Sequence, residues 1–254
     1  MKNIFKGVLL IFFLTISCTQ DDGLGNDLSS NYAFKQQVGF SANDILSNKK
    51  FTDIYIEVMY VDGFKPSAET LTNLKNFIGL RTYKNNIIVE ERLIDITLKS
   101  VYSMEDVRSI EDANRSIFSF DNQLAISALF LNGKSSSDTD TTTILGTSYR
   151  NTSFVIFEET IKTTSNNILG SSKITLESTV ILHEFCHLLG LVNFGTNMVT
   201  NHEDNAHSAH CSVENCLMYY LIENGKNVHH WVNDTQIPQL DAYCIDDLRA
   251  NGGK

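Results

Sequence analysis

Residues 180–190, which read Val-Ile-Leu-His-Glu-Phe-Cys-His-Leu-Leu-Gly, constrain what this chain can fold into more than any other stretch. On an α-helix each residue advances by about 100°, so His183 and His187 lie one turn apart on the same face and can hold one metal ion. Glu184 lies at the edge of that face, where its carboxylate can act on a metal-bound water. Apolar residues cover the other side, and Gly190 suits a helix C-terminus. The pattern predicts a buried helix with a metal-binding face; a pair of purely structural histidines is the alternative.

The N-terminal residues have the composition of an export signal. Residues 1–17 combine two lysines with the apolar run 8–16, which is too short to cross a bilayer as a permanent helix. The run ends in Leu-Thr-Ile-Ser-Cys, which resembles a bacterial lipoprotein signal with Cys18 as the lipidated first residue. Thr15 fits that signal poorly, so cleavage by the ordinary signal peptidase is an alternative, and a buried first helix is another.

A polar tether is expected after the signal. Residues 18–33 would hold a single domain, residues 34–254, away from a membrane through the lipid alone. We expect an exported lipoprotein at the outer membrane or cell surface, with a secreted or periplasmic protein as the alternative. The full chain carries a formal net charge of −10, and removal of the two N-terminal lysines makes it about −12. This charge argues against nucleic acid as a partner.

The remaining pattern predicts an α+β fold with a twisted mixed sheet and helices packed on one side of it. The site helix should begin between Ser172 and Glu177, with Thr175 as a candidate cap. No internal repeat or second apolar core is evident, and polar loops are expected at 132–143 and 193–209. The other expected elements are strands at 51–61, 87–96, 124–131 and 153–157, a helix opening at Pro66 with Leu71, Leu74, Phe77 and Ile78 on one face, and helices at 104–116 and 238–250.

Two histidines do not complete a catalytic zinc site, which needs three protein ligands and an open position for water. The sequence resembles the metzincin clan of zinc peptidases, whose pattern is His-Glu-x-x-His-x-x-Gly-x-x-His followed by a methionine turn. His183, Glu184, His187 and Gly190 match this pattern, but the next ligand position falls on Asn193. A carboxamide is a weak zinc ligand, so the third ligand is expected elsewhere.

The best resemblance downstream is to the archaemetzincin branch, in which the third histidine is followed by Cys, four residues, Cys, one residue and Met. His210, Cys211, Cys216 and Met218 reproduce that block, displaced by about 17 added residues. The resemblance implies that His210 is the third zinc ligand. The alternatives left open are His207, His202, Asn193, and an acidic ligand at Glu203.

The resemblance also implies roles for neighbouring residues. Met218 would form the methionine turn beneath the histidines, and the Tyr220 hydroxyl would stabilise the transition state; ordinary core packing is the alternative for each. Archaemetzincins end in a Cys-x-x-Cys pair that helps to bind a second zinc, whereas this chain has only Cys244 there. We therefore expect one catalytic zinc ion and a disulfide from Cys211 to Cys216, or from either to Cys244, with Cys186 a plain core residue.

Together these features predict an exported zinc metallopeptidase with Glu184 as the general base. The fold class implied is a metzincin-like zincin with an upper subdomain at about 34–191 and a lower one at about 192–254. A peptide or protein substrate would pair with an edge strand, for which residues 124–131 are a weak candidate. The alternative is a surface lipoprotein that binds a protein or glycan through a fold with a structural or degenerate metal site. Cleavage specificity, endo- or exopeptidase action and oligomeric state stay open.

Overall fold

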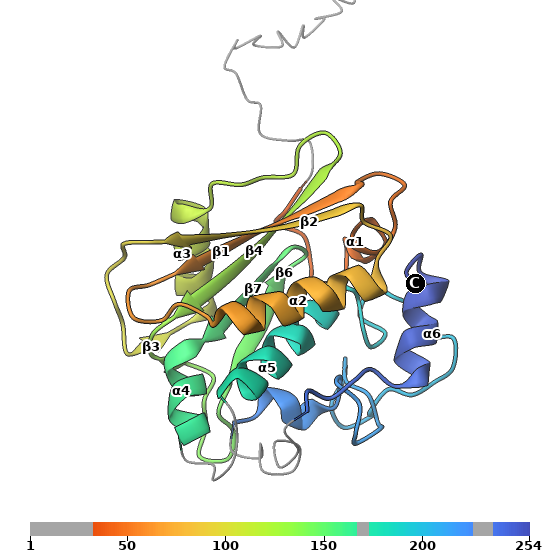
Figure 1. Ribbon diagram of the computed structural model, residues 1–254. Helices are drawn as coiled ribbons and strands as arrows, with labels where there is room; N and C mark the ends of the chain where they lie inside the picture. The colour runs from red at the N-terminus through yellow and green to blue at the C-terminus, as the bar shows by residue number, and fades with distance from the viewer. Residues whose placement is uncertain (1–32, 167–172, 226–235) are drawn as a thin grey trace, which may run out of the picture.

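A five-stranded sheet runs through the computed structural model, which describes residues 33–166, 173–225 and 236–254 (Figure 1). Its strand order is β2-β1-β4-β7-β6, and all neighbours are parallel except the antiparallel pair β6 and β7. The strands are β1 (Asp53–Tyr60), β2 (Asn86–Leu93), β4 (Gln123–Leu131), β6 (Gly146–Arg150) and β7 (Ser153–Phe157), with a small separate sheet of β3 (Val101–Tyr102) and β5 (Lys134–Ser135). The helices are α1 (Ala42–Leu46), α2 (Ala68–Arg81), α3 (Met104–Asn114), α4 (Glu158–Asn166), α5 (Lys173–Leu188), the 3₁₀ turn η1 (Tyr220–Glu223) and α6 (Ala242–Ala250).

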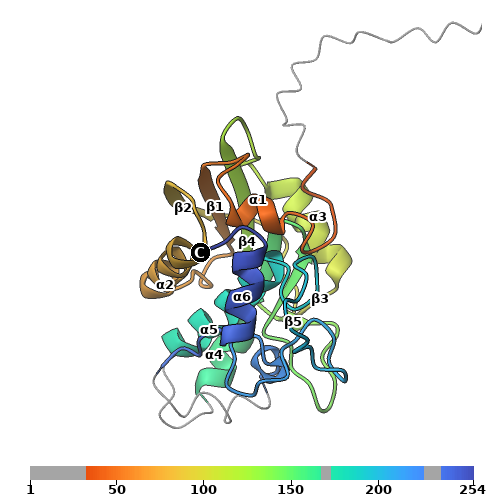
Figure 2. The same cartoon turned by 90° about the vertical axis from the view of Figure 1, so that its right-hand side faces the viewer.

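Apolar side chains cover both faces of this sheet, so the expectation of helices on one side and of a single core was wrong. Successive strand residues point to opposite faces. Ile126 and Phe130 of β4 therefore pack in the cluster that includes α2 and α5, whereas Leu129 packs with Val107 of α3 in a second cluster. Figure 2 shows α2 and α3 on opposite sides of the strands. Central strands buried on both faces explain the continuous apolar runs in the sequence.

Most predicted elements are present, but the edge of the sheet was assigned wrongly. Residues 124–131 form β4, which lies in the centre of the sheet between β1 and β7. The edge next to the site is β6, whose sequence Gly-Thr-Ser-Tyr-Arg lacks the apolar alternation that would have predicted a strand. The helices α1 and α4 were also not predicted.

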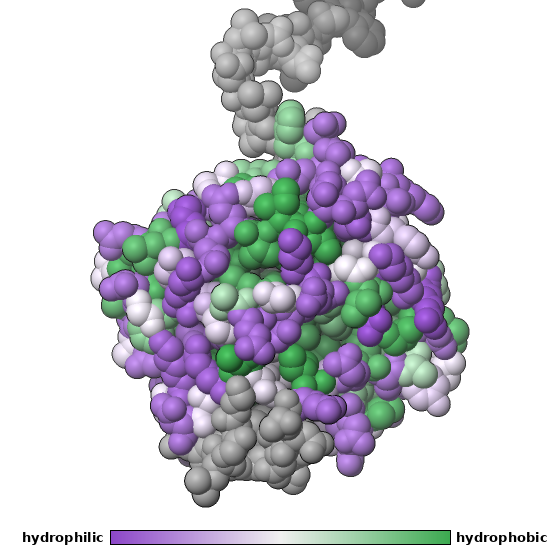
Figure 3. Space-filling model, viewed as in Figure 1, coloured by the Kyte–Doolittle hydropathy of each residue, from purple (hydrophilic) through white to green (hydrophobic). Residues whose placement is uncertain are grey.

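In Figure 3 the hydrophobic surface on the face of Figure 1 is broken into patches by hydrophilic side chains. Within the described ranges, no helix has the length and apolar character needed to cross a membrane. The predicted signal, Cys18 and most of the tether lie outside the described residues.

The site helix α5 is buried along almost its whole length, on the same face of the sheet as α2 (Figure 1). It is described from Lys173 onward, so Thr175 lies inside the helix, where its carbonyl accepts a hydrogen bond from Thr179, and is not the cap. Gly190 follows the last turn with φ of +79°, and a Cβ atom there would lie 2.5 Å from the Thr196 nitrogen. The predicted glycine terminus is therefore confirmed, because a larger residue would be both strained and crowded.

A buried carboxylate ties α5 to α2. The Glu177 carboxylate accepts hydrogen bonds from the Ser67 hydroxyl at 2.7 Å and the Thr70 hydroxyl at 2.6 Å, and pairs with Lys173 at 3.1 Å. Burial by itself would raise the pKa of Glu177, but the hydrogen bonds from Thr70 and Ser67 and the charge of Lys173 leave the pKa below its ordinary value. Because Ser67 is also the N-cap of α2, one ionised side chain fixes both helices.

Replacing Glu177 with alanine is expected to lower the free energy of unfolding by about 2–3 kcal/mol, since it leaves buried donors without an acceptor. The ionised Glu177 stabilises the fold at neutral pH. This stabilisation is lost as the pH falls below the ordinary pKa of 4.5 and then through the lower pKa of the folded state, so wild type and Glu177→Ala should become equally stable in acid. Urea denaturation at several pH values measures this difference. The matched control Glu69→Ala, at an exposed position of α2, should cost less than about 0.5 kcal/mol. Equal losses for both variants would contradict the assignment.

Candidate metal centre

Three imidazoles converge at the end of α5. His183 and His187 project from successive turns of the helix, and their Nε2 atoms lie 3.1 Å apart. His210 arrives from the far end of the loop that follows Gly190, and its ring centroid lies 5.3 Å from that of His183 and 5.2 Å from that of His187. His183 is fully buried and His187 nearly so. The structure therefore brings together the two histidines of the helical pattern and the histidine implied by the downstream block.

Backbone carbonyls orient all three rings. Nδ1 of His183 donates to the Leu217 carbonyl at 2.7 Å, Nδ1 of His187 to the Leu191 carbonyl at 3.1 Å, and Nδ1 of His210 to the Ser208 carbonyl at 3.0 Å. A carbonyl only accepts, so each Nδ1 carries the proton and each Nε2 of the neutral ring presents a lone pair. Metal-bound histidines are held in this way in other proteins.

A fourth ligand atom faces the imidazoles. Oε1 of Glu223, the last residue of η1, lies 3.1, 2.9 and 3.0 Å from Nε2 of His183, His187 and His210. Burial lowers the pKa of His183 to about 4, so that ring is neutral near pH 7 and has no proton to offer on Nε2. The lone pairs of His183 and Glu223 therefore point at one another, an arrangement that a cation stabilises. Burial alone would lower the pKa of His210, but the hydrogen bond and charge of Glu223 leave it raised.

The donor set fits zinc. Ligand atoms about 2.0–2.1 Å from a tetrahedral zinc ion lie about 3.3 Å from one another, close to the 3.1 Å between the helical Nε2 atoms. The four side chains offer three nitrogen atoms and one oxygen atom, all within 4.8 Å of one another. The described residues thus contain a group able to hold a zinc ion.

Glu184 lies beside these ligands and is not one of them. Its carboxylate is fully buried, and the Ser148 hydroxyl of β6 lies 3.1 Å from Oε2. Among the described residues, Oε1 of Glu184 has no hydrogen-bond partner. Burial, and then the charge of Glu223, raise the pKa of Glu184 well above its ordinary value. A buried oxygen with a raised pKa and a free lone pair suits a proton acceptor.

The other residues considered for the third ligand lie elsewhere. Asn193 adopts φ of +55° and donates to Glu203 at 3.2 Å, while Glu203 also accepts from the Ala209 amide at 3.1 Å. These two residues therefore tie the two ends of the loop that carries His210. His202 is buried against Cys211 and Asp247, and His207 pairs with Asp204.

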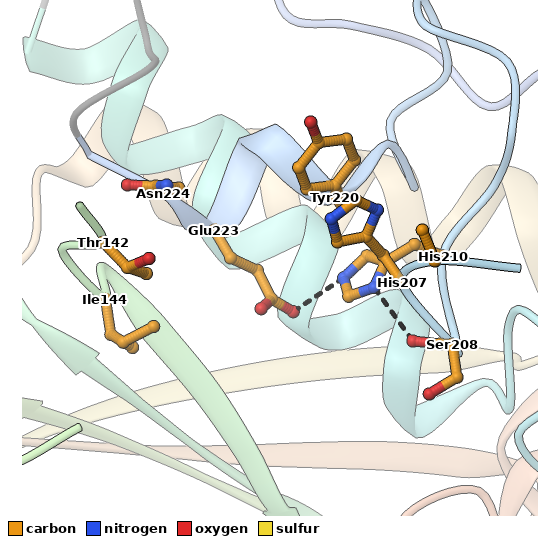
Figure 4. A pocket seen from close by; sticks show the side chains of 9 residues that line it. Thr142, Ile144, His207, Ser208, His210, Tyr220, Glu223 and Asn224 are labelled. Atoms are coloured by element: carbon orange, nitrogen blue, oxygen red, sulfur yellow. Dashed lines mark hydrogen bonds and ion pairs between the residues drawn. The ribbon is translucent and has the colours of Figure 1, made fainter. Parts of the chain in front are cut away.

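Tyr220 and Met218 are near the site but do not touch the imidazole nitrogens. The Tyr220 ring stacks on His207 with centroids 3.5 Å apart, and its hydroxyl points away from His210 and Glu223 (Figure 4). Met218 is fully buried in the apolar cluster that includes α2 and α5, here called the main core. The carbonyl of the preceding residue, Leu217, accepts the hydrogen bond from His183. The roles assigned to Tyr220 and Met218 stay predictions.

The described cysteines are all free, so neither the expected disulfide between Cys211 and Cys216 nor the alternative to Cys244 is present. Cys211 lies 3.2 Å from His202 and donates to Asp241, while Cys216 and Cys244 have their sulfur atoms 3.6 Å apart. Hydrogen bonds from Cys211 and Cys244 hold the pKa of Cys216 well below its usual range. His202, Cys211, Asp241 and Cys244, here called the sulfur cluster, form a second group able to hold a metal ion. Cys186 is buried in the main core.

Two pockets meet at the metal centre. One, of about 410 Å³, is bordered by Thr142, Ile144, His207 and Tyr220 (Figure 4). The other, of about 150 Å³, is bordered by Thr147, Ser148, Glu184, His187 and Phe194. His210 and Glu223 border both pockets, so the ligand group has open space on two sides.

Sequence reasoning missed Glu223 and Ser148. Glu223 follows Met218 by five residues without any spacing pattern, and Ser148 lies on a strand that the sequence did not reveal. The sequence offered only one indication of Glu223 as a ligand: it is an acidic residue shortly after the block of Cys211, Cys216 and Met218.

No protein-family model matches this sequence, and no curated protein matches it. Among solved structures, the chain is similar to the archaemetzincin of Methanopyrus kandleri, with 13% identity and a TM-score of 0.51 over 79% of this chain and 96% of that one. It is also similar to the archaemetzincin of Archaeoglobus fulgidus complexed with malonate, with 16% identity and a TM-score of 0.41 over 77% and 99%. The mostly parallel twisted sheet with packed helices is therefore consistent with the archaemetzincin fold.

Proposed function

We propose that this chain is an exported zinc metallopeptidase. The observation that carries the proposal is the convergence of three Nε2 lone pairs, from His183, His187 and His210, beside the buried carboxylate of Glu184. A purely structural site would not need a buried, unpartnered carboxylate oxygen at its edge, because such an oxygen costs free energy. That cost is expected at a site that moves protons.

In this proposal His183, His187 and His210 would hold a zinc ion, which would supply an activated water and polarise the scissile carbonyl. Glu184 accepts the water proton on Oε1 and delivers it to the leaving amine. The Ser148 hydroxyl, which donates to the Glu184 carbonyl at 2.7 Å and lies 3.1 Å from Oε2, ties Glu184 to β6 beside the site. The rings keep their orientation through the carbonyls of Leu217, Leu191 and Ser208.

The substrate proposed is an extended peptide that lies across the two pockets. The edge strand β6 supports this choice, because its residues Thr147 and Ser148 border the smaller pocket and contact the site. Main-chain pairing along an edge strand binds peptides with little sequence preference. β6 therefore replaces residues 124–131 as the proposed docking strand.

The location remains a proposal from the N-terminal sequence. Residues 1–17 and Cys18 would direct export and lipid attachment, residues 18–33 would form the tether, and the catalytic domain would begin near residue 34. The anchor would be the lipid alone, at the outer membrane or cell surface. The negative net charge argues against nucleic acid as a partner, because nucleic acid is also negatively charged.

Chelation provides the direct test of this function. Casein or a peptide library should be cleaved by the purified protein, and a chelator such as 1,10-phenanthroline should remove at least about 99% of the rate, because zinc supplies the activated water. Adding zinc back should restore cleavage. Cleavage that resists the chelator would contradict the proposal, and an inert zinc-loaded protein that still binds a protein or glycan would favour the alternative of a binding lipoprotein.

A further inference from the structure

We propose that Glu223 is a fourth ligand of the zinc ion, so that a carboxylate of the chain itself closes the position needed for catalysis. The inference rests on the proposed function, because it requires zinc at His183, His187 and His210. The inference adds a resting state in which all four positions around the zinc ion are filled and the enzyme is inactive. Glu223 must withdraw from this state before a peptide can bind.

The distances place the Glu223 oxygen at a corner of the ligand group and not at its centre. An atom in the place of the metal would lie about 2 Å from each Nε2, whereas neighbouring ligands of a tetrahedral zinc ion are about 3.3 Å apart. Oε1 of Glu223 lies 2.9–3.1 Å from all three Nε2 atoms, close to the second value. The oxygen thus stands where the fourth ligand of a zinc ion belongs.

The backbone around Glu223 is held, so the carboxylate is not a surface group that happens to reach the site. Its carbonyl accepts a hydrogen bond from the Leu145 amide at 3.1 Å, just before β6. The preceding residue, Ile222, is buried in the main core. The following residue, Asn224, accepts from the Thr143 amide at 3.1 Å. These contacts fix the start of the side chain and leave its three χ angles to decide whether the carboxylate binds or leaves.

The position of Glu223 between the pockets gives this ligand a consequence for substrate. Glu223 borders both pockets, and its side chain is about one quarter exposed. A peptide lying across the metal centre would therefore meet this carboxylate. The exchange would need no chemical co-reactant: withdrawal of the Glu223 carboxylate would open the position for a water or for the substrate carbonyl oxygen.

Cobalt substitution tests the inference without measuring activity. Visible absorption of the Co(II) protein reports the ligands of the ion, and the spectrum of the double variant His183→Ala/His187→Ala can be subtracted to remove any signal from the sulfur cluster. We expect Glu223→Ala to change the difference spectrum and to raise the zinc dissociation constant at least about tenfold. Added acetate should return the spectrum of Glu223→Ala toward wild type and leave the wild-type spectrum unchanged, because the wild-type position is already filled.

Two further variants separate ligation from charge. Glu223→Asp keeps the charge but shortens the side chain, so it should behave like Glu223→Ala. Glu214→Gln removes an exposed charge from the same segment and should leave spectrum and affinity unchanged. If Glu223→Ala and wild type give the same spectrum while His210→Ala loses its cobalt, Glu223 is not a ligand and the metallopeptidase proposal stands. If wild type binds no more cobalt than the double variant His183→Ala/His187→Ala, the proposed function fails, and this inference fails with it.

Discussion

Replacing Glu184 with glutamine should reduce kcat/KM for peptide cleavage by about 10³-fold or more while the zinc content stays at the wild-type level. General acid–base catalysis by one side chain contributes about 10²–10⁴-fold, and Glu184 is the carboxylate placed beside the ligands without being in contact with their Nε2 atoms. Glutamine has nearly the same shape and can keep the contact with Ser148, so the fold should be preserved. Elemental analysis and single-turnover cleavage of a fluorogenic peptide measure the two quantities.

Two further variants test whether the effect of Glu184→Gln comes from loss of the proton acceptor. Glu184→Ala should lose as much activity as the glutamine variant, since both lack the proton acceptor. Ser148→Ala should lose less, because it removes one hydrogen bond and leaves the carboxylate in place. Retention of wild-type turnover by Glu184→Gln would show that another group takes the proton, whereas loss of zinc from that variant would show that Glu184 acts on the metal site as a whole.

Replacing His210 with alanine should remove one equivalent of zinc per chain and abolish cleavage. Loss of His210 leaves the two helical imidazoles and the Glu223 carboxylate, which the proposed mechanism requires to withdraw, so the remaining site should lose its zinc to a competing chelator. The measurement is zinc per chain after dialysis against a weak chelator, compared with wild type. The zinc content of His210→Ala is subtracted from that of wild type, because any metal held by the sulfur cluster is present in both proteins and does not affect the difference.

The controls for His210→Ala are variants of the residues that the sequence left open as alternative third zinc ligands. His207→Ala and Asn193→Ala should retain the equivalent that His210→Ala loses, since His207 stacks on Tyr220 and Asn193 contacts Glu203. His202→Ala tests the neighbouring sulfur cluster and should leave the His210-dependent equivalent in place. Zinc loss in His207→Ala with retention in His210→Ala would move the third ligand.

The local parts of this protein were predictable because they depend on neighbours along one element. The four-residue spacing of His183 and His187, the position of Glu184 on the same helix and the terminus at Gly190 all follow from helix geometry. The strands at β1, β4 and β7 were found because buried strands need apolar, β-branched residues, whereas the edge strand β2 was found from its run of β-branched residues although none of its residues is buried. The resemblance downstream then directed attention to His210.

Whatever depends on the path between elements had to come from the tertiary structure. The loop from Gly190 to His210 passes through left-handed residues at Asn193 and Ala209, and no spacing rule says where such a path ends. The same limit applies to Glu223, whose oxygen reaches three imidazoles from a segment held against β6, and to the order of strands, which made residues 124–131 central. The sequence alone determined which face of one helix can bind a metal, since periodicity is local. Only the folded chain decided which distant side chains complete that face, because their meeting depends on loop conformation and packing.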